Sequence, residues 1–108
     1  MLNDPSQVEA ARSLAELTLR QSTTGLKARF NALGQQVLSR PFDDREQVLL
    51  AKLLRAHIED FEAKPAEADK LIRTGIAPVP GDIPPVELAA WTSVARAVLN
   101  LHETITRN

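Results

Sequence analysis

Apolar residues recur every three or four positions along most of this chain, which is the spacing of helices that bury one face. The first predicted helix ends near Arg20, and Asp4 or Ser6 is expected to cap its start. Glu9 stands three residues after Ser6, which is the spacing of a capping box. The predicted apolar face is Val8, Ala11, Ala15 and Leu19. The predicted polar stripe is Glu9, Arg12 or Ser13, Glu16 and Arg20.

Two further helices follow with the same spacing. The second must stop before Pro41, because the residue ahead of a proline resists helical backbone. Its apolar stripe is Leu26, Phe30, Leu33 and Val37. The third, roughly residues 44–62, starts at a predicted capping box of Asp43 and Glu46. Its two faces are Leu50, Leu54, Ile58 and Phe61 against Lys52, Arg55, Glu59 and Glu62.

Prolines and glycines divide the rest of the chain. A short fourth helix opens at Lys64-Pro65 and ends at Gly75, a residue that favours the left-handed backbone of a helix stop. Residues 76–85, IAPVPGDIPP, hold four of the seven prolines and predict an extended connector. The last helix is expected from about Pro85 to Thr104.

These elements predict an all-α fold, a compact bundle of about five helices with the proline-rich connector before the last helix. The 108 residues are enough for a single domain, 1–108, with one core. The chain is 44% hydrophobic and 25% charged, which is the balance of an ordinary globular domain.

Composition and charge exclude several classes of function. Thirteen Lys and Arg against fourteen Asp and Glu give a net charge of -1, which provides no electrostatic basis for binding nucleic acid. The absence of cysteine excludes thiolate nucleophiles, disulfides and cysteine zinc sites. No apolar stretch reaches the ~18 residues of a membrane span. The first residues, MLNDPSQVEA, lack the pattern of a signal peptide.

The sequence also argues against three other kinds of site. The linker SRPFDD puts two acids where the second helix of a helix-turn-helix would enter DNA. Four scattered glycines cannot form a phosphate-binding loop. The carboxylate pairs Asp43-Asp44 and Glu59-Asp60 lie near caps or on polar faces, so they give no support for acid–base catalysis.

The histidines are the remaining candidates for chemistry. His102 and Glu103 lack the second histidine of a zinc-protease motif, because Thr106 stands in its place. At about 100° per residue, His102 falls within the apolar arc and Glu103 points elsewhere. His102 and His57 are therefore predicted to be core or interface histidines, each with one nitrogen hydrogen-bonded. The weaker alternative is a metal held by both histidines and a carboxylate of Glu103 or Asp60.

The sequence therefore predicts no catalytic residue, no metal ligand and no cofactor. Trp91, the single tryptophan, is expected to be a packing anchor rather than a ligand platform. The other predicted core side chains are Phe30, Phe61 and Leu99.

Three stretches of the chain follow a recognisable pattern: LNDPSQVEAARSLAE, LSRP and PVELAAWTSVARAVLNLHETITRN. They resemble the motifs LNDP-x-x-VEAARALA, LARP and AAW-x-x-VAR-x-LLNLDEF-x-TR in the C-terminal region of a planctomycete cytochrome-c-associated protein family of unknown function. The likeness extends over nearly the whole chain and is most specific in the last helix. This sequence departs from the pattern at His102, where the family usually has Asp or Asn, and at Thr104, where it has Phe.

The resemblance implies a C-terminal module of a larger protein that is exported, periplasmic or at the cell surface. The family has no established reaction, so it implies no catalytic residues. We therefore expect a non-catalytic helical interaction or docking module, whose partner is protein: the rest of a parent chain or a second copy. The alternative is a fragment of an enzyme whose active site lies mostly upstream.

The last helix also carries more apolar surface than one stripe requires, since Val94, Ala97, Leu101 and Ile105 extend the arc through Trp91. Such a helix is either central in its bundle or shares a face with a partner. We expect an exposed apolar patch that involves Leu2, Leu101 and Ile105.

Overall fold

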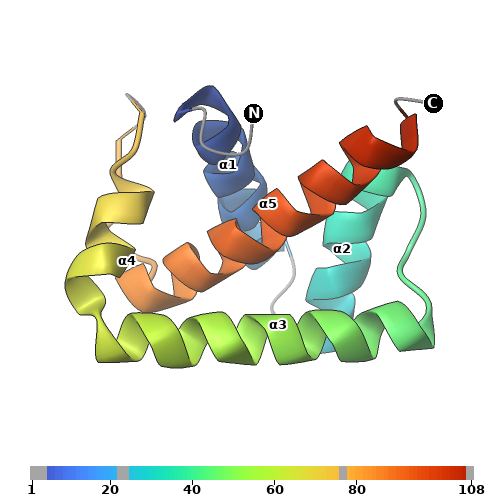
Figure 1. The fold of residues 1–108 in the computed structure, drawn as a ribbon, viewed down its shortest axis with the longest axis horizontal. Helices are drawn as coiled ribbons and strands as arrows, with labels where there is room; N and C mark the ends of the chain where they lie inside the picture. Colours follow the sequence, from blue (N-terminus) through green and yellow to red (C-terminus); the bar gives the residue numbers. More distant parts are fainter. Residues whose placement is uncertain (1–4, 22–24, 76–77, 107–108) are drawn as a thin grey trace.

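Five α-helices make up the described part of the chain, as the sequence predicts (Figure 1). The computed structural model describes residues 5–21, 25–75 and 78–106, with the backbone alone for Pro5 and residues 103–106. Within these ranges there is no strand. The helices are α1 (Pro5–Gln21), α2 (Leu26–Leu38), α3 (Asp44–Ala63), α4 (Pro65–Ile72) and α5 (Pro85–Thr106). The radius of gyration is 13.1 Å, close to the roughly 13 Å of a compact domain of this size.

Helix α5 is the centre of the bundle. It crosses the molecule diagonally and packs against α1, α2, α3 and α4 (Figure 1). Its first half is apolar almost all round, which requires burial on every side. The fully or nearly fully buried side chains of α5 are Leu88, Ala89, Ala90, Trp91, Thr92, Val94, Ala95 and Val98. Four helices can enclose α5 because its three buried alanines let the neighbouring backbones approach closely.

The helix ends follow local chemistry. Asp43 accepts a hydrogen bond from the backbone N–H of Glu46, and the Glu46 carboxylate accepts one from the N–H of Asp43, so the predicted capping box is confirmed. Gly75 has the predicted left-handed backbone, with φ 97°, but α4 ends before it, at Ile72, with Arg73 as its C-cap. Helix α1 begins at Pro5, so Ser6 lies inside it and is not its cap. Asp4, the other predicted cap, lies outside the described residues.

Helix α2 ends before Pro41, as predicted, through a turn that depends on a glycine. Ser39 takes a left-handed conformation, with φ 58°, and the chain then folds back over α2. A Cβ added to Gly34 would lie 2.6 Å from the backbone oxygen of Arg40 and 3.2 Å from the ring of Phe42. The missing side chain at Gly34 therefore lets the α2–α3 linker approach and places Phe42 in the core.

The predicted apolar faces point inward, with two corrections. On α1, the four predicted apolar residues are buried. Of the two alternatives for the polar stripe, Ser13 is exposed, whereas Arg12 is only 2% exposed. Its Nη1 donates a 2.9 Å hydrogen bond to the backbone oxygen of Ile72, at the end of α4. On α2, Phe30 and Leu33 are buried, whereas Leu26 is exposed.

The described part of the connector, residues 78–84, runs without helix to the start of α5 at Pro85, as predicted. Val79 and Ile83 pack against the core. Arg20 of α1 donates two hydrogen bonds to the Asp82 carboxylate, at 2.8 and 3.0 Å. This bidentate pair fastens the connector to α1 and so fixes where α5 enters the bundle.

Candidate interaction site

Trp91 lies in the core, where the sequence predicts a packing anchor. Trp91 is 2% exposed, and its ring lies 5.1 Å from the ring of Phe30, centroid to centroid, at an angle of 44°. Phe61 and Leu99 are half-buried and pack against the same core. These four side chains stabilise the bundle by removing apolar surface from water, and none of them presents a reactive group.

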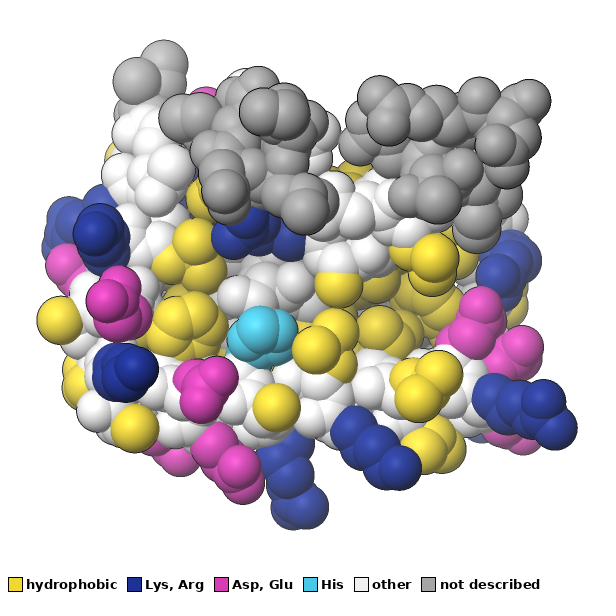
Figure 2. All heavy atoms as spheres, viewed as in Figure 1, with side chains coloured by type: hydrophobic (Ala, Val, Ile, Leu, Met, Phe, Trp, Pro, Cys, Tyr) yellow, Lys and Arg dark blue, Asp and Glu magenta, His cyan; other side chains and the backbone are white. Residues whose placement is uncertain are grey.

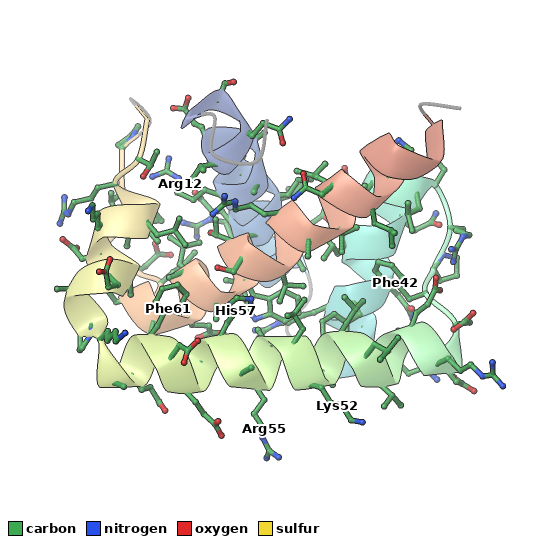
Figure 3. All side chains as sticks on the ribbon, in the orientation of Figure 1. Arg12, Phe42, Lys52, Arg55, His57 and Phe61 are labelled. Atoms are coloured by element: carbon green, nitrogen blue, oxygen red, sulfur yellow. The ribbon has the colours of Figure 1, made fainter. Side chains whose placement is uncertain are left out.

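His57 lies half-buried on the side of α3 that faces α5 (Figure 3). Its ring stacks on that of Phe61, with 6.3 Å between centroids and an angle of 22°. Burial lowers the pKa of His57 below its ordinary value, the charge of Asp60 raises it, and the charge of Arg96 lowers it further. The imidazole is therefore held in its neutral form, as expected of a packed histidine.

The structure assembles no metal centre in its described part. No group of three His, Cys, Asp or Glu side chains among the described residues lies close enough together to hold an ion. His102 is half-buried in the late turns of α5, and the side chain of Glu103 lies outside the described residues. Of the two carboxylates in the weaker alternative, Asp60 forms no such group with His57 and His102, and Glu103 stays untested.

The carboxylates do not form a catalytic pair either. Asp43 and Asp44 are exposed at the start of α3, where Asp43 caps the helix, and Glu59 and Asp60 are exposed farther along it. Acid–base catalysis needs two such groups in a shared, partly desolvated cleft. Exposed carboxylates next to each other on one helix do not provide it.

Of the three predicted interface residues, Leu101 can be placed. It is 52% exposed near the end of α5, whereas Leu2 and the side chain of Ile105 lie outside the described residues. Val94, which the sequence analysis grouped with Leu101, is fully buried. Helix α5 is therefore enclosed along its first half and open to solvent at Leu101.

Leu101 lines a shallow apolar groove of about 280 Å³ between α3 and α5. We call it the α3–α5 groove; its lining is Phe42, Glu46, Leu49, Leu50, Leu53, Ala97, Val98 and Leu101. Hydrophobic side chains gather between the two helices in Figure 2. Leu49, at 65% exposure, forms one wall opposite Leu101.

The single charged side chain of this groove is already paired. Glu46 accepts two hydrogen bonds from the Arg40 guanidinium, each of 3.0 Å. The Arg40 contact and the backbone N–H of Asp43 lower the pKa of Glu46, so its carboxylate stays ionised and is no proton donor. The groove can bury apolar surface, but it offers no free charge and no nucleophile to a ligand.

A larger hollow of about 710 Å³ lies on the other side of α3 and is open to solvent. Leu54, Ile58 and Trp91 contribute apolar lining, and Arg29 pairs with Glu87 within it at 3.2 Å. Its remaining charged lining residues are Lys52, Arg55 and Glu62, all of them exposed on α3. No reactive pair of groups converges there.

The sequence pattern does not predict the structural roles of three residues. Arg12 follows Val8 by four positions and precedes Ala15 by three, so its spacing did place it on the buried face, but its charge argued against burial. Phe42 gave no periodic signal because it stands in a linker. The role of Gly34 depends on a contact with Arg40 and Phe42, which helical spacing does not reveal.

Comparisons with protein-family models, with curated proteins and with solved structures gave no match to this chain. The resemblance to the planctomycete family therefore stays a prediction. No helix in the described part of the chain is long and apolar enough to cross a membrane.

Proposed function

We propose that this chain is a non-catalytic helical module of a larger exported protein, and that it docks on protein through the α3–α5 groove. The observation that supports this most is that Leu49 of α3 and Leu101 of α5 line the same apolar groove, with both side chains more than half exposed. Large aliphatic side chains exposed together in a surface hollow are typical of a protein-binding site.

The occupant that fits is the apolar face of an amphipathic helix from the parent chain or from a partner protein. The groove runs between two helices, and a third helix can lie in such a depression with apolar side chains at every third or fourth position. Glu46 is the one charged lining residue and Arg40 already neutralises it, so a charged ligand gains nothing there. The exported context follows from the family resemblance alone and shares its status as a proposal.

The test is site-directed photo-crosslinking in the native host. A photo-reactive amino acid at position 101 should form an adduct of one defined mass, and the crosslinked peptide should be an amphipathic helical segment. Position 17 is the matched control, because Leu17 is also exposed but lines none of the grooves described above. Adding Leu49→Glu should abolish the adduct while leaving the circular dichroism spectrum unchanged. Equal adducts from positions 17 and 101, or none from 101, would overturn the proposal.

A further inference from the structure

The outward side of α3 is exposed between Lys52 and Ala63. We call it the α3 ridge; it consists of Lys52, Arg55, Ala56, Glu59, Glu62 and Ala63, all of them exposed. Figure 3 shows Lys52 and Arg55 pointing away from the rest of the bundle. Helix α3 lies along one edge of the molecule (Figure 1), and Lys52, Arg55 and Glu62 also border the larger hollow described above.

Charge is divided along the ridge. Lys52 and Arg55 make its N-terminal half basic, and Glu59 and Glu62 make its C-terminal half acidic. Figure 2 shows basic side chains beneath the middle and right of α3 and acidic ones beneath its left. None of these four forms an ion pair with another described residue.

This order of charges does not stabilise α3 itself. The C-terminal end of a helix carries partial negative charge and favours cations, yet the last turn of α3 contains no basic residue. Within the helix, Arg55 precedes Glu59 by four positions, which is the less favourable orientation of such a pair. Cations of a partner beside the acidic half, and anions beside the basic half, would stabilise this arrangement of charges.

We propose that the partner is a second copy of this chain, packed with its α3 antiparallel to the first. Antiparallel packing about a two-fold axis near Ala56 brings the basic half of each ridge, with Lys52 and Arg55, against the acidic half of the other, with Glu59 and Glu62. Parallel packing would instead set like charges against each other. The ridge is thus complementary to itself, as the contact surface of a two-fold dimer must be.

The shape of the surface fits the same arrangement. Ala56, at the proposed axis, has a side chain small enough for two helix backbones to approach. Ala63 is equally small.

Disulfide trapping tests the orientation directly, because the chain has no cysteine of its own. In the full chain, Ala56→Cys should oxidise to a covalent dimer, since the two copies of this residue meet at the axis within reach of a disulfide. Ala63→Cys is the matched control: its two copies lie at opposite ends of an antiparallel contact and should stay monomeric under oxidation. Crosslinking at both positions, at Ala63 alone or at neither overturns the proposal.

Charge exchange tests the electrostatics. In sedimentation experiments across a concentration series, Lys52→Glu with Arg55→Glu should weaken the dimer at least tenfold. Adding Glu59→Lys and Glu62→Lys exchanges the two halves, keeps the net charge and should restore the dimer. A fourfold variant as weak as the double variant, or wild-type protein that stays monomeric throughout, contradicts the proposal.

The inference does not rest on the proposed function. Leu101→Glu alters the α3–α5 groove and not the ridge, so it should leave the dimer intact. If position 101 formed no photo-crosslinked adduct while the dimer stayed intact, only the proposal of docking at the groove would be refuted. If Leu101→Glu abolished dimerisation and the charge variants left it unchanged, only the proposal of a dimer through the ridge would be refuted.

Discussion

Arg12 on α1 donates a hydrogen bond from Nη1 to the backbone oxygen of Ile72, 60 residues away, at 2.9 Å and out of contact with solvent. Ile72 ends α4, so its carbonyl is one of those that a helix leaves without an intrahelical partner. Nε of the same guanidinium has no hydrogen-bond partner among the described residues. Arg12 thus caps a remote helix at the expense of desolvating a charged group.

We expect Arg12→Ala to lower the free energy of unfolding by about 2–4 kcal/mol, because it empties core volume and leaves the Ile72 oxygen unpaired. Arg12→Met retains most of the volume and removes the buried charge, so its loss should be about 1 kcal/mol. Urea titrations of the two variants provide the comparison. Equal losses would show that hydrogen bonding by the guanidinium, rather than its packing, determines the cost.

Trp91→Ala should cost about 3–5 kcal/mol of unfolding free energy, because it leaves a cavity beside Phe30 in the most enclosed part of the core. Leu17→Ala, at an exposed position of α1, should change the same quantity by less than about 0.5 kcal/mol. Denaturant titration followed by circular dichroism measures both. A loss below about 1 kcal/mol for Trp91→Ala would contradict the burial described above.

Gly34→Ala should destabilise the fold even though alanine is the better helix former by about 1 kcal/mol. The new Cβ would lie 2.6 Å from the backbone oxygen of Arg40, so the α2–α3 linker would have to move and displace Phe42. Gly81→Ala is the control, because a Cβ there meets nothing within 4 Å. Thermal unfolding should show a lower midpoint for Gly34→Ala and no decrease for Gly81→Ala.

The stability of the protein should depend on pH through His57. Its folded-state pKa lies below the ordinary value of 6.5, so the unfolded chain takes up a proton first as the pH falls. This contribution to stability is fully present above 6.5 and is lost as the pH falls through that value toward the folded-state pKa. His57→Gln should flatten this part of the profile in urea titrations between about pH 7.5 and pH 5. An unchanged slope would place His57 in solvent.

Zinc or cobalt added to dialysed protein should show no stoichiometric site of micromolar affinity. A metal site needs several convergent ligands, and neither histidine has two such neighbours among the described residues. Calorimetric titration provides the measurement. A single tight site lost in both His57→Ala and His102→Ala would refute this prediction.

The sequence determined the helices and most of their ends, because these depend on residues close together in the chain. The capping box of Asp43 and Glu46 and the left-handed Gly75 act over three or four positions, so their consequences follow from the sequence. The same is true of the inward faces, since a period of 3.6 residues fixes which side chains share a side of the helix.

Only the tertiary structure decided what each face meets. Leu101 and Val94 look alike in the pattern of α5, yet Val94 is fully buried and Leu101 is 52% exposed. Arg12 is buried because the end of α4 offers it a carbonyl oxygen, and that oxygen belongs to a residue 60 positions away. Helical spacing says which way a side chain points; what lies there depends on how remote segments pack, which no local pattern encodes.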